Sequence, residues 1–154
     1  AFTHHQYDPE DASSVASSTV FDLLEDSRGL FWVCTDRGLD RFDKKAGTFI
    51  HISAAQGFTA KIVHNVVEDE HGRLWLGTDI GLVHYDAVAE RVLKVYTKGD
   101  GLHSHDFWPT SRRRTQTGQL WFGGFNGVNS FHPDDLFDNE TPPHIVLTSV
   151  KQGW

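Results

Sequence analysis

Residues 68–82 read EDEHGRLWLGTDIGL, and this stretch decides the fold. Asp69 is followed three residues later by Gly72, a pattern typical of a type I turn that ends in a left-handed glycine. The next residues, RLWLGT, have the aromatic and apolar content of a β-strand. A second turn, TDIG, then leads into the alternating segment LVHYD. The stretch therefore predicts two consecutive β-hairpins.

The same pattern recurs along the chain at nearly fixed intervals. A shift of 43 residues places 20–52 on 63–95, and a further shift of 46 residues reaches a third copy. The first shift aligns Val20/Val63, Glu25/Glu68, Asp26/Asp69, Gly29/Gly72, Trp32/Trp75, Thr35/Thr78, Gly38/Gly81, Leu39/Leu82 and Asp43/Asp86. The second aligns Gly72/Gly118, Leu74/Leu120, Trp75/Trp121, Gly77/Gly123, Gly81/Gly127 and Tyr85/Phe131. A period of this length is typical of a propeller blade, which contains four strands.

The repeats predict an all-β chain: a β-propeller fragment of about three four-stranded antiparallel blades, with almost no helix. The equivalent tryptophans, Trp32, Trp75 and Trp121, are expected to pack between blades. The expected parts are the end of a preceding blade and a linker at 1–17 with a strand at 1–6, blade 1 at 18–53, blade 2 at 54–97, blade 3 at 98–139, and a closing strand or the start of a following domain at 140–154. The strands of blades 2 and 3 are expected within 61–97 and 105–150.

The composition excludes several classes of protein. A net charge of −7 argues against a nucleic-acid binder, which needs a basic face. Cys34 is the only cysteine, which excludes an internal disulfide and a cysteine zinc site, and we expect it to be a buried, inert thiol. No segment has the length and apolar content of a membrane span. The chain starts with Ala and contains no Met, so we expect a piece of a longer protein, and no motif indicates a cofactor.

The adjacent acids Glu68 and Asp69 raise the alternative of a glycosidase site, because paired carboxylates carry out acid–base chemistry there. The same pair recurs at Glu25 and Asp26, whereas an active site rarely recurs in every repeat. Adjacent residues also do not supply the required separation across a cleft. We therefore interpret these acids as turn residues. The glycines match neither of the common phosphate-binding loops.

Two functions of different classes fit a propeller with these features. The first is a sensory or binding segment without catalysis. The alternative is a fragment of a propeller-fold glycan hydrolase or lyase, since sialidase-type repeats also place Asp, Gly and Trp at a hairpin. Those repeats have one residue between Asp and Gly, whereas two stand here, which favours the first function. The sequence lacks the dipeptides that are characteristic of WD repeats, which argues against a docking module of that type.

The pattern VxxxxEDxxGxxWxxTxxGLxxxD resembles the two-component regulator propeller repeat, over nearly the whole chain. Residues 101–133 resemble the last blade of such a propeller, through GGFNG at 123–127 and FHP at 131–133. PPHIVLTSVKQGW at 142–154 resembles the start of the triple-tyrosine immunoglobulin-like domain that follows it. The resemblance implies a periplasmic, non-catalytic ligand sensor, often for oligosaccharides, in a bacterial two-component receptor. A histidine kinase or diguanylate cyclase output, and any membrane contact, would lie in other parts of that receptor.

The third repeat departs from the first two, and departures are where a function is added. Arg112, Arg113 and Arg114 replace part of an apolar inner strand, with Arg112 and Arg114 on one face and Arg113 on the other. They are candidates for gripping a carboxylate or sulfate, and Trp108 for stacking on a sugar. The other interpretation is a polar exposed face, or arginines paired with nearby acids.

The sequence HSHD, at the start of the third repeat, is a weaker candidate site. His105 joins the proposed ligand-binding residues. His103 and His105 have the spacing for a metal site on one strand face, with Asp106 nearby. A third ligand is not apparent, so we expect a solvated loop and no metal. His4 and His5 are also expected to be solvated.

Three repeats are too few to close a ring of four to eight blades. Two blade faces would therefore remain bare and apolar, and we expect the chain to self-associate through them.

Overall fold

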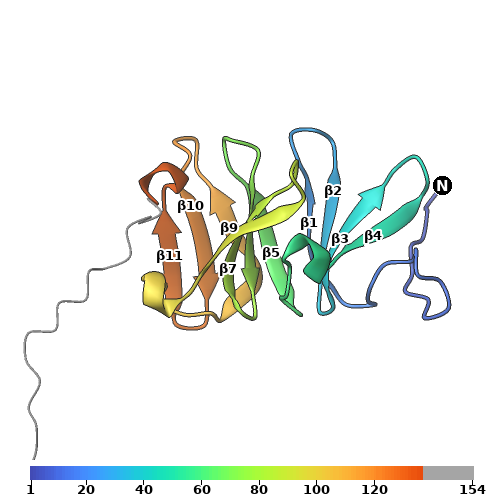
Figure 1. The fold of residues 1–154 in the computed structure, drawn as a ribbon, viewed down its shortest axis with the longest axis horizontal. Coiled ribbons are helices and arrows are strands. Elements are labelled where there is room, and N and C mark those ends of the chain that lie inside the picture. Colours follow the sequence, from blue (N-terminus) through green and yellow to red (C-terminus); the bar gives the residue numbers. More distant parts are fainter. Residues whose placement is uncertain (137–154) are drawn as a thin grey trace, which may run out of the picture.

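The computed structural model describes residues 1–136, which form three antiparallel β-sheets, one beside the next (Figure 1). Blade 1 contains β1 (Val20–Glu25), β2 (Phe31–Thr35), β3 (Gly38–Asp43) and β4 (Thr48–Ile52). Blade 2 contains β5 (Val63–Glu68), β6 (Leu74–Thr78), β7 (Gly81–Asp86) and β8 (Arg91–Tyr96). Blade 3 contains, within the described residues, β9 (Phe107–Arg114), β10 (Leu120–Gly124) and β11 (Gly127–Phe131). Each sheet is a meander whose strands pair in sequence order.

These sheets confirm the predicted all-β fold. The helical segments of the described chain are three short 3₁₀ turns: η1 (Ala54–Gln56), η2 (Lys98–Asp100) and η3 (Pro133–Asp135). None of the helices within residues 1–136 has the length and apolar character needed to cross a bilayer.

The strand predicted at residues 1–6 is wrong. Strand formation requires a neighbouring strand to hydrogen-bond with, and the structure assigns no strand to these residues; His5 and the adjacent Tyr7 make side-chain contacts with blade 1 instead. The His5 ring lies edge-on to Phe42 with centroids 4.8 Å apart, and Tyr7 accepts a hydrogen bond of 2.8 Å from Arg37. The fourth strand expected for blade 3 before residue 150, and the segment at 140–154, lie outside the described residues.

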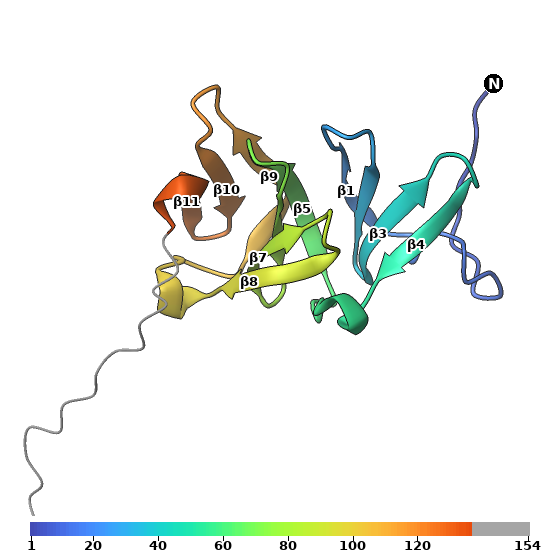
Figure 2. The ribbon, with the colours of Figure 1, turned by 45° about the horizontal axis from the view of Figure 1, so that its top comes forward.

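The first strands of the three blades lie on the inner side of the arrangement. β1 contacts β5, β5 contacts β9, and β1 also contacts β9 although they belong to blades 1 and 3. Figure 2 shows β4 and β8 at the opposite edges of their sheets from β1 and β5. A propeller places its first strands around a central channel in this way.

The turn between β5 and β6 is organised by Asp69. Its Oδ1 atom accepts hydrogen bonds of 2.9 Å from the backbone N–H groups of His71 and Arg73. Its Oδ2 atom accepts a bond of 2.8 Å from Trp75 Nε1, and both partners are buried. Gly72 has a φ of 72°, the left-handed conformation that the sequence predicts. One carboxylate therefore closes the turn and also holds the indole ring of the next strand.

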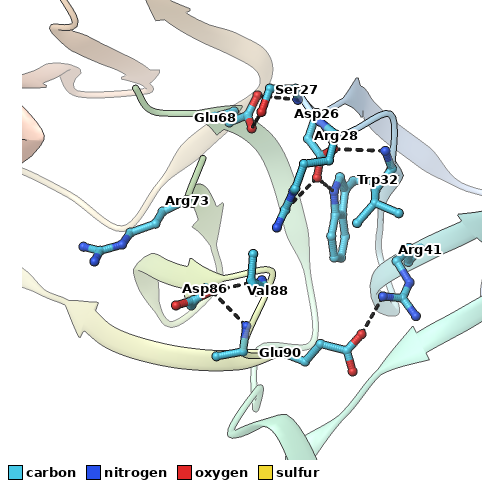
Figure 3. Close-up of polar contacts among 12 residues, drawn as sticks. Asp26, Ser27, Arg28, Trp32, Arg41, Glu68, Arg73, Asp86, Val88 and Glu90 are labelled. Carbon is cyan, nitrogen blue, oxygen red and sulfur yellow. Dashed lines mark hydrogen bonds and ion pairs between the residues drawn. The ribbon is translucent and has the colours of Figure 1, made fainter. Parts of the chain in front are cut away.

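Blade 1 repeats this arrangement with Asp26, which accepts bonds from Leu30 N and from Trp32 Nε1, each of 3.0 Å (Figure 3). Arg28 adds a side-chain bond of 2.9 Å to the same carboxylate. Burial of Asp26 acts to raise its pKa, but the hydrogen bonds from Trp32, Arg28 and the backbone outweigh burial and hold the pKa below the usual 3.8. The carboxylate is therefore charged at neutral pH, when it is the best acceptor for the indole.

The third copy lacks this aspartate, and its tryptophan behaves differently. Thr115 stands in the place of Asp69 and accepts a bond of 3.1 Å from Gln119 N, which preserves the turn. Trp121 Nε1 instead donates to Gln119 Oε1 at 3.2 Å. The Trp121 side chain is 37% exposed, whereas Trp32 and Trp75 are 0% and 1% exposed. Packing between blades is therefore confirmed for the first two tryptophans and not for the third.

The hydrophobic cores lie between the blades and not within them. One buried cluster joins blades 1 and 2, and it contains Trp32, Cys34, Leu39, Ile52, Phe58, Ala60, Val63, Val66, Leu74, Leu76, Val83, Tyr85 and Ala87. The other joins blades 2 and 3, and it contains Val67, Trp75, Leu82, Tyr96, Phe107, Leu120 and Phe122. Each blade is thus stabilised by its neighbour. Burial also raises the pKa of the Cys34 thiol well above its usual value, which keeps it protonated.

Polar contacts also connect blades 1 and 2 at the edges of their shared core. Ser27, in the first turn of blade 1, donates bonds of 2.8 Å from its backbone N–H and 2.7 Å from its hydroxyl to the carboxylate of Glu68 (Figure 3). Arg41 on β3 pairs with Glu90, in the last turn of blade 2. Glu68 is therefore a contact between blades, which adds a second role to the turn residue that the sequence predicts.

We expect Trp75→Ala to lower the free energy of unfolding by about 3–5 kcal/mol, because it empties the core between blades 2 and 3 and leaves Asp69 without its indole partner. The measurement is guanidinium unfolding followed by circular dichroism. Trp121→Ala is the matched control and should have a much smaller effect, because that ring is partly exposed. Equal losses for the two variants would contradict the placement of the core.

We also expect the exposed pair between His71 and Asp134, 2.7 Å apart, to raise the pKa of His71 above 6.5, mainly through the hydrogen bond. A raised folded pKa means that the stability it contributes is fully present below pH 6.5 and is lost as the pH rises through the folded value. Titration by NMR should show a lower His71 pKa in Asp134→Asn. Asp135→Asn, which removes a neighbouring charge on the same turn, should leave the pKa of His71 closer to its value in the parent. An unchanged His71 pKa in Asp134→Asn would show that the pair is absent in solution.

Candidate ligand-binding site

The inner strands carry polar side chains at equivalent positions. Asp22 on β1, Asn65 on β5 and Ser111 on β9 coincide under the shifts of 43 and 46 residues. Asn65 is fully buried, and its amide donates to the carbonyl oxygen of Trp108 at 2.9 Å while its oxygen accepts from Gly77 N at 3.2 Å. Buried polar groups of this kind require partners, and here the partners join blade 2 to blade 3.

Gly77 on β6 shows how closely the neighbouring strands β5 and β9 approach around Asn65. A Cβ atom built on Gly77 would lie 2.5 Å from Asn65 Oδ1 and 2.8 Å from the ring of Phe107. Only glycine leaves room for both the amide and the ring. This inner polar row was not predicted from the sequence. A signal for it existed, since VFDLLED and VHNVVED each contain one polar residue at the same place in an apolar run.

Arg112 is partly buried, with 29% of its side chain exposed. Its Nε and Nη2 atoms donate to Oδ2 and Oδ1 of Asp22, each at 2.9 Å, which forms a two-pronged ion pair from blade 3 to blade 1. Asp22 is 7% exposed and also accepts a bond of 3.1 Å from the backbone N–H of Val66. The carboxylate therefore connects the inner strands of all three blades. Arg112 thus has an acid of the chain itself as its partner.

The two other arginines are exposed and lie on opposite faces of β9. The register places Arg114 opposite Leu120 and Arg113 opposite Trp121. Leu120 belongs to the core with blade 2, whereas Trp121 lies on the side of the sheet away from blade 2. Arg113 and Arg114 are therefore accessible to a ligand but do not converge on one point.

Trp108 forms an exposed aromatic pair with Phe125. The ring centroids are 4.4 Å apart at an angle of 82°, and the two side chains are 49% and 72% exposed. Trp108 and Arg114 lie toward opposite ends of β9, but the strand bulges between them, where Thr110 has a φ of 57°. Phe107 and Arg114 are paired with residues of β10 that are only four positions apart, which is roughly 13 Å at the rise of an extended chain. The predicted ligand-binding residues thus divide into an aromatic group at one end of β9 and a basic group at the other.

His105 belongs to neither group. Its Nε2 atom accepts a hydrogen bond of 3.1 Å from the backbone N–H of Lys98 in η2, so the ring holds a loop together. Within the part of the chain that the structure describes, no three His, Cys, Asp or Glu side chains gather into a group that could hold a metal ion. His105 remains a predicted ligand-binding residue, but its observed contact is structural.

We expect Arg112→Ala to destabilise the protein by about 3–5 kcal/mol, because it leaves the carboxylate of Asp22 buried without its ionic partner. Arg113→Ala is the matched control on the next residue and should change the free energy of unfolding by no more than about 0.5 kcal/mol. Urea unfolding of the two variants and the parent provides the comparison. A parent-like midpoint for Arg112→Ala would mean that the ion pair does not join the blades.

Comparison with solved structures shows the same fold. The chain superposes with a TM-score of 0.68 and 23% identity on an extracellular domain assigned to the hybrid two-component system BT3049 of B. thetaiotaomicron, covering 87% of this chain and 18% of that one. For the extracellular domain assigned to BT4673 of the same organism, the TM-score is 0.70 at 19% identity, over 80% of this chain and 18% of that one. PorZ, a surface component of the type IX secretion system of Porphyromonas gingivalis, gives 0.66 at 19% identity, over 86% and 20%.

The chain therefore spans about a fifth of the length of these structures. No curated protein matches its sequence. The family model of the two-component regulator propeller matches residues 14–37 and 57–79, which lead into the inner strands and continue through the Asp–Gly turns of blades 1 and 2. The matched segments include both Asp–Trp pairs, Asp26 with Trp32 and Asp69 with Trp75. Blades 1 and 2 thus each contain a segment that matches the two-component regulator propeller repeat.

Proposed function

We propose that the chain is a non-catalytic, ligand-binding segment of the extracytoplasmic sensor of a bacterial two-component receptor, and that its ligand is a carbohydrate. The matched repeats support the signalling role. Two of the similar structures are extracellular domains assigned to hybrid two-component systems, BT3049 and BT4673, which supports a location outside the cytoplasm. We propose the periplasm as that location.

The observation that carries the carbohydrate proposal is the exposed pair of Trp108 and Phe125. Aromatic rings present a flat apolar face, which suits the C–H face of a sugar ring, and exposed large aromatic rings mark binding sites. The register of β9 with β10 places Phe107 where β5 has Val63, so Trp108 corresponds to His64, which is half-buried, and Phe125 corresponds to Asp79, which is exposed. A further blade placed against blade 3 would therefore leave Phe125 exposed and Trp108 partly exposed.

Arg113 and Arg114 extend the proposed site along β9. An oligosaccharide of several units is long enough to reach from the aromatic pair to these side chains, which lie roughly 13 Å away along the strand. Guanidinium groups bind carboxylate and sulfate groups through paired hydrogen bonds, so acidic sugars are the preferred ligand class. A negatively charged chain needs such a local basic group to hold an anionic ligand.

The recurring acidic residues make structural contacts, which argues against a role for them in hydrolysis. Glu68 accepts two hydrogen bonds from Ser27, and Asp69 is used by the turn and by Trp75. In blade 1, Glu25 pairs with Lys44 and Asp26 repeats the turn and indole bonds. A general acid or base needs a free carboxyl group near the scissile bond, and these four residues have structural roles.

We expect titration with a panel of neutral, uronic-acid and sulfated oligosaccharides to change the tryptophan fluorescence, and calorimetry to give a binding constant. Trp108→Ala should weaken binding by about tenfold or more, which corresponds to the loss of one stacked ring, about 1.4 kcal/mol. Trp121→Ala is the matched control, since it removes another partly exposed ring of blade 3 and should bind as the parent does.

Binding of no member of the panel, or parent-like binding by Trp108→Ala, would overturn the carbohydrate proposal. Product release should be assayed on the same panel. Turnover that Glu68→Gln abolishes would instead establish the hydrolase or lyase alternative.

A further inference from the structure

Each inner strand has a bulge near its start, and the bulge of β9 is larger than the other two. In blade 2, His64 and Asn65 of β5 stand against the single residue Gly77 of β6. Blade 1 has the same arrangement. In blade 3, all of residues 108–111 of β9 stand against the single residue Gly123 of β10. Blade 3 therefore contains an insertion of two residues on its inner strand, which we call the extended bulge (residues 108–111).

Thr110, within the extended bulge, has a strained backbone. Its φ is 57°, in the left-handed region, where the Cβ substituents of a β-branched residue crowd the backbone. Glu90 is the one other non-glycine residue of the described chain with a positive φ, and it lies in a turn. Strain of this kind persists only where the surrounding structure enforces it, and it gathers at binding sites.

The surrounding structure holds the extended bulge at both ends. A Cβ atom built on Gly124 would lie 1.9 Å from the carbonyl oxygen of Asp106, and one built on Gly123 would lie 2.2 Å from Ser111 Oγ. The two glycines therefore let β9 approach β10 closely before and after the bulge. From blade 2, Asn65 donates a hydrogen bond of 2.9 Å to the carbonyl oxygen of the first residue of the bulge. The inserted residues are thus fixed in place.

The strained residue also carries an available polar group. The Thr110 side chain is exposed, and its hydroxyl has no hydrogen-bond partner among residues 1–136. Trp108 lies two residues away in the same bulge, within roughly 7 Å along the chain, with its ring beside Phe125. The bulge therefore combines a flat aromatic ring with a hydroxyl that can both donate and accept, which suits a sugar with hydroxyl groups around an apolar ring face.

The extended bulge lies on the inner side of the blades, where β9 contacts both β1 and β5. Its equivalent in blade 2, His64, is half-buried although blades 1 and 3 lie on either side of blade 2. The bulge of blade 3 has two residues more at this place. Its accessibility therefore does not depend on an uncovered blade face.

We propose that Thr110 is a second ligand-contacting residue of the site that contains Trp108, and that the extended bulge holds its backbone in the left-handed region to present the hydroxyl to a sugar hydroxyl. This inference rests on the carbohydrate function proposed above. The Trp108 ring supplies stacking, and Thr110 supplies a directed hydrogen bond that fixes the orientation of the sugar on the ring. Thr110 thus contributes to specificity, because a site that hydrogen-bonds a hydroxyl rejects analogues that lack it.

The test is calorimetric titration with the uronic-acid and sulfated oligosaccharides of the panel. Thr110→Val retains the shape and the strained backbone and removes only the hydroxyl, so the dissociation constant should rise about tenfold, or about 1.4 kcal/mol. Thr110→Ser retains the hydroxyl and should bind within about threefold of the parent. Thr59→Val is the matched control, because Thr59 is an exposed threonine between η1 and β5, and it should bind as the parent does.

Thr110→Gly measures the strain without a ligand. Glycine adopts a φ of 57° without the crowding of a Cβ atom, so the equilibrium constant for unfolding should fall roughly threefold. The same variant lacks the hydroxyl and should bind as weakly as Thr110→Val. Urea unfolding should therefore give a raised midpoint together with a reduced affinity, whereas a residue with a purely structural role would not change the affinity when its strain is relieved.

Parent-like binding by Thr110→Val, where the parent binds an oligosaccharide, would overturn this inference and leave the carbohydrate proposal intact. Binding of no oligosaccharide by the parent would overturn the carbohydrate proposal, and this inference with it. A lowered midpoint for Thr110→Gly, or weakened binding by Thr59→Val, would also contradict the role of Thr110. Circular dichroism checks that each variant is folded, and Thr110→Ala replaces the valine variant if that one is not.

Discussion

The hydrogen bond from a buried tryptophan to the aspartate six residues before it is the interaction on which the rest of the structure depends. It occurs as Trp32 with Asp26 and as Trp75 with Asp69. The same carboxylate closes the turn that brings the two strands together, so the hairpin and the position of the ring are set at once. Because the ring projects from the sheet, it is buried only when the next blade covers it. A local turn thereby determines that the core forms between blades.

This constraint explains why the third blade differs. Thr115 preserves the turn but does not bind an indole, and Trp121 is correspondingly exposed. The same repeat also has new features, namely the Arg112–Asp22 ion pair and the exposed rings of Trp108 and Phe125. Blade 3 thus combines an uncovered junction surface with side chains suited to a ligand. In a longer chain of the same repeats, an adjacent blade would cover the surface around Trp121 and leave the aromatic pair at the edge accessible.

Local features of the fold were predictable from the sequence, and contacts between distant residues were not. The Asp–Gly turns and the paired strands follow from spacing within about 20 residues and from the repeat itself. The ion pair of Arg112 joins residues 90 positions apart, and no local pattern distinguishes it from a solvent-facing arginine. The proposed ligand residues were predicted from their chemistry and from their departure from the repeat, and neither of these signals their division between the two ends of β9. The strand expected at residues 1–6 depended on a neighbouring strand that the structure does not provide for it.

The central claim is that each blade is stable only through the cores it shares with its neighbours. Hydrogen exchange of the Trp32 indole N–H, followed by NMR in the parent and in Trp75→Phe, tests it most directly. Trp32 lies in the core between blades 1 and 2, and the substitution weakens the other core, between blades 2 and 3. If the blades depend on one another, protection of Trp32 should fall by the same free energy that the substitution removes from global unfolding. Unchanged protection of Trp32, with a lowered global stability, would show that the two junctions open independently and would contradict the account.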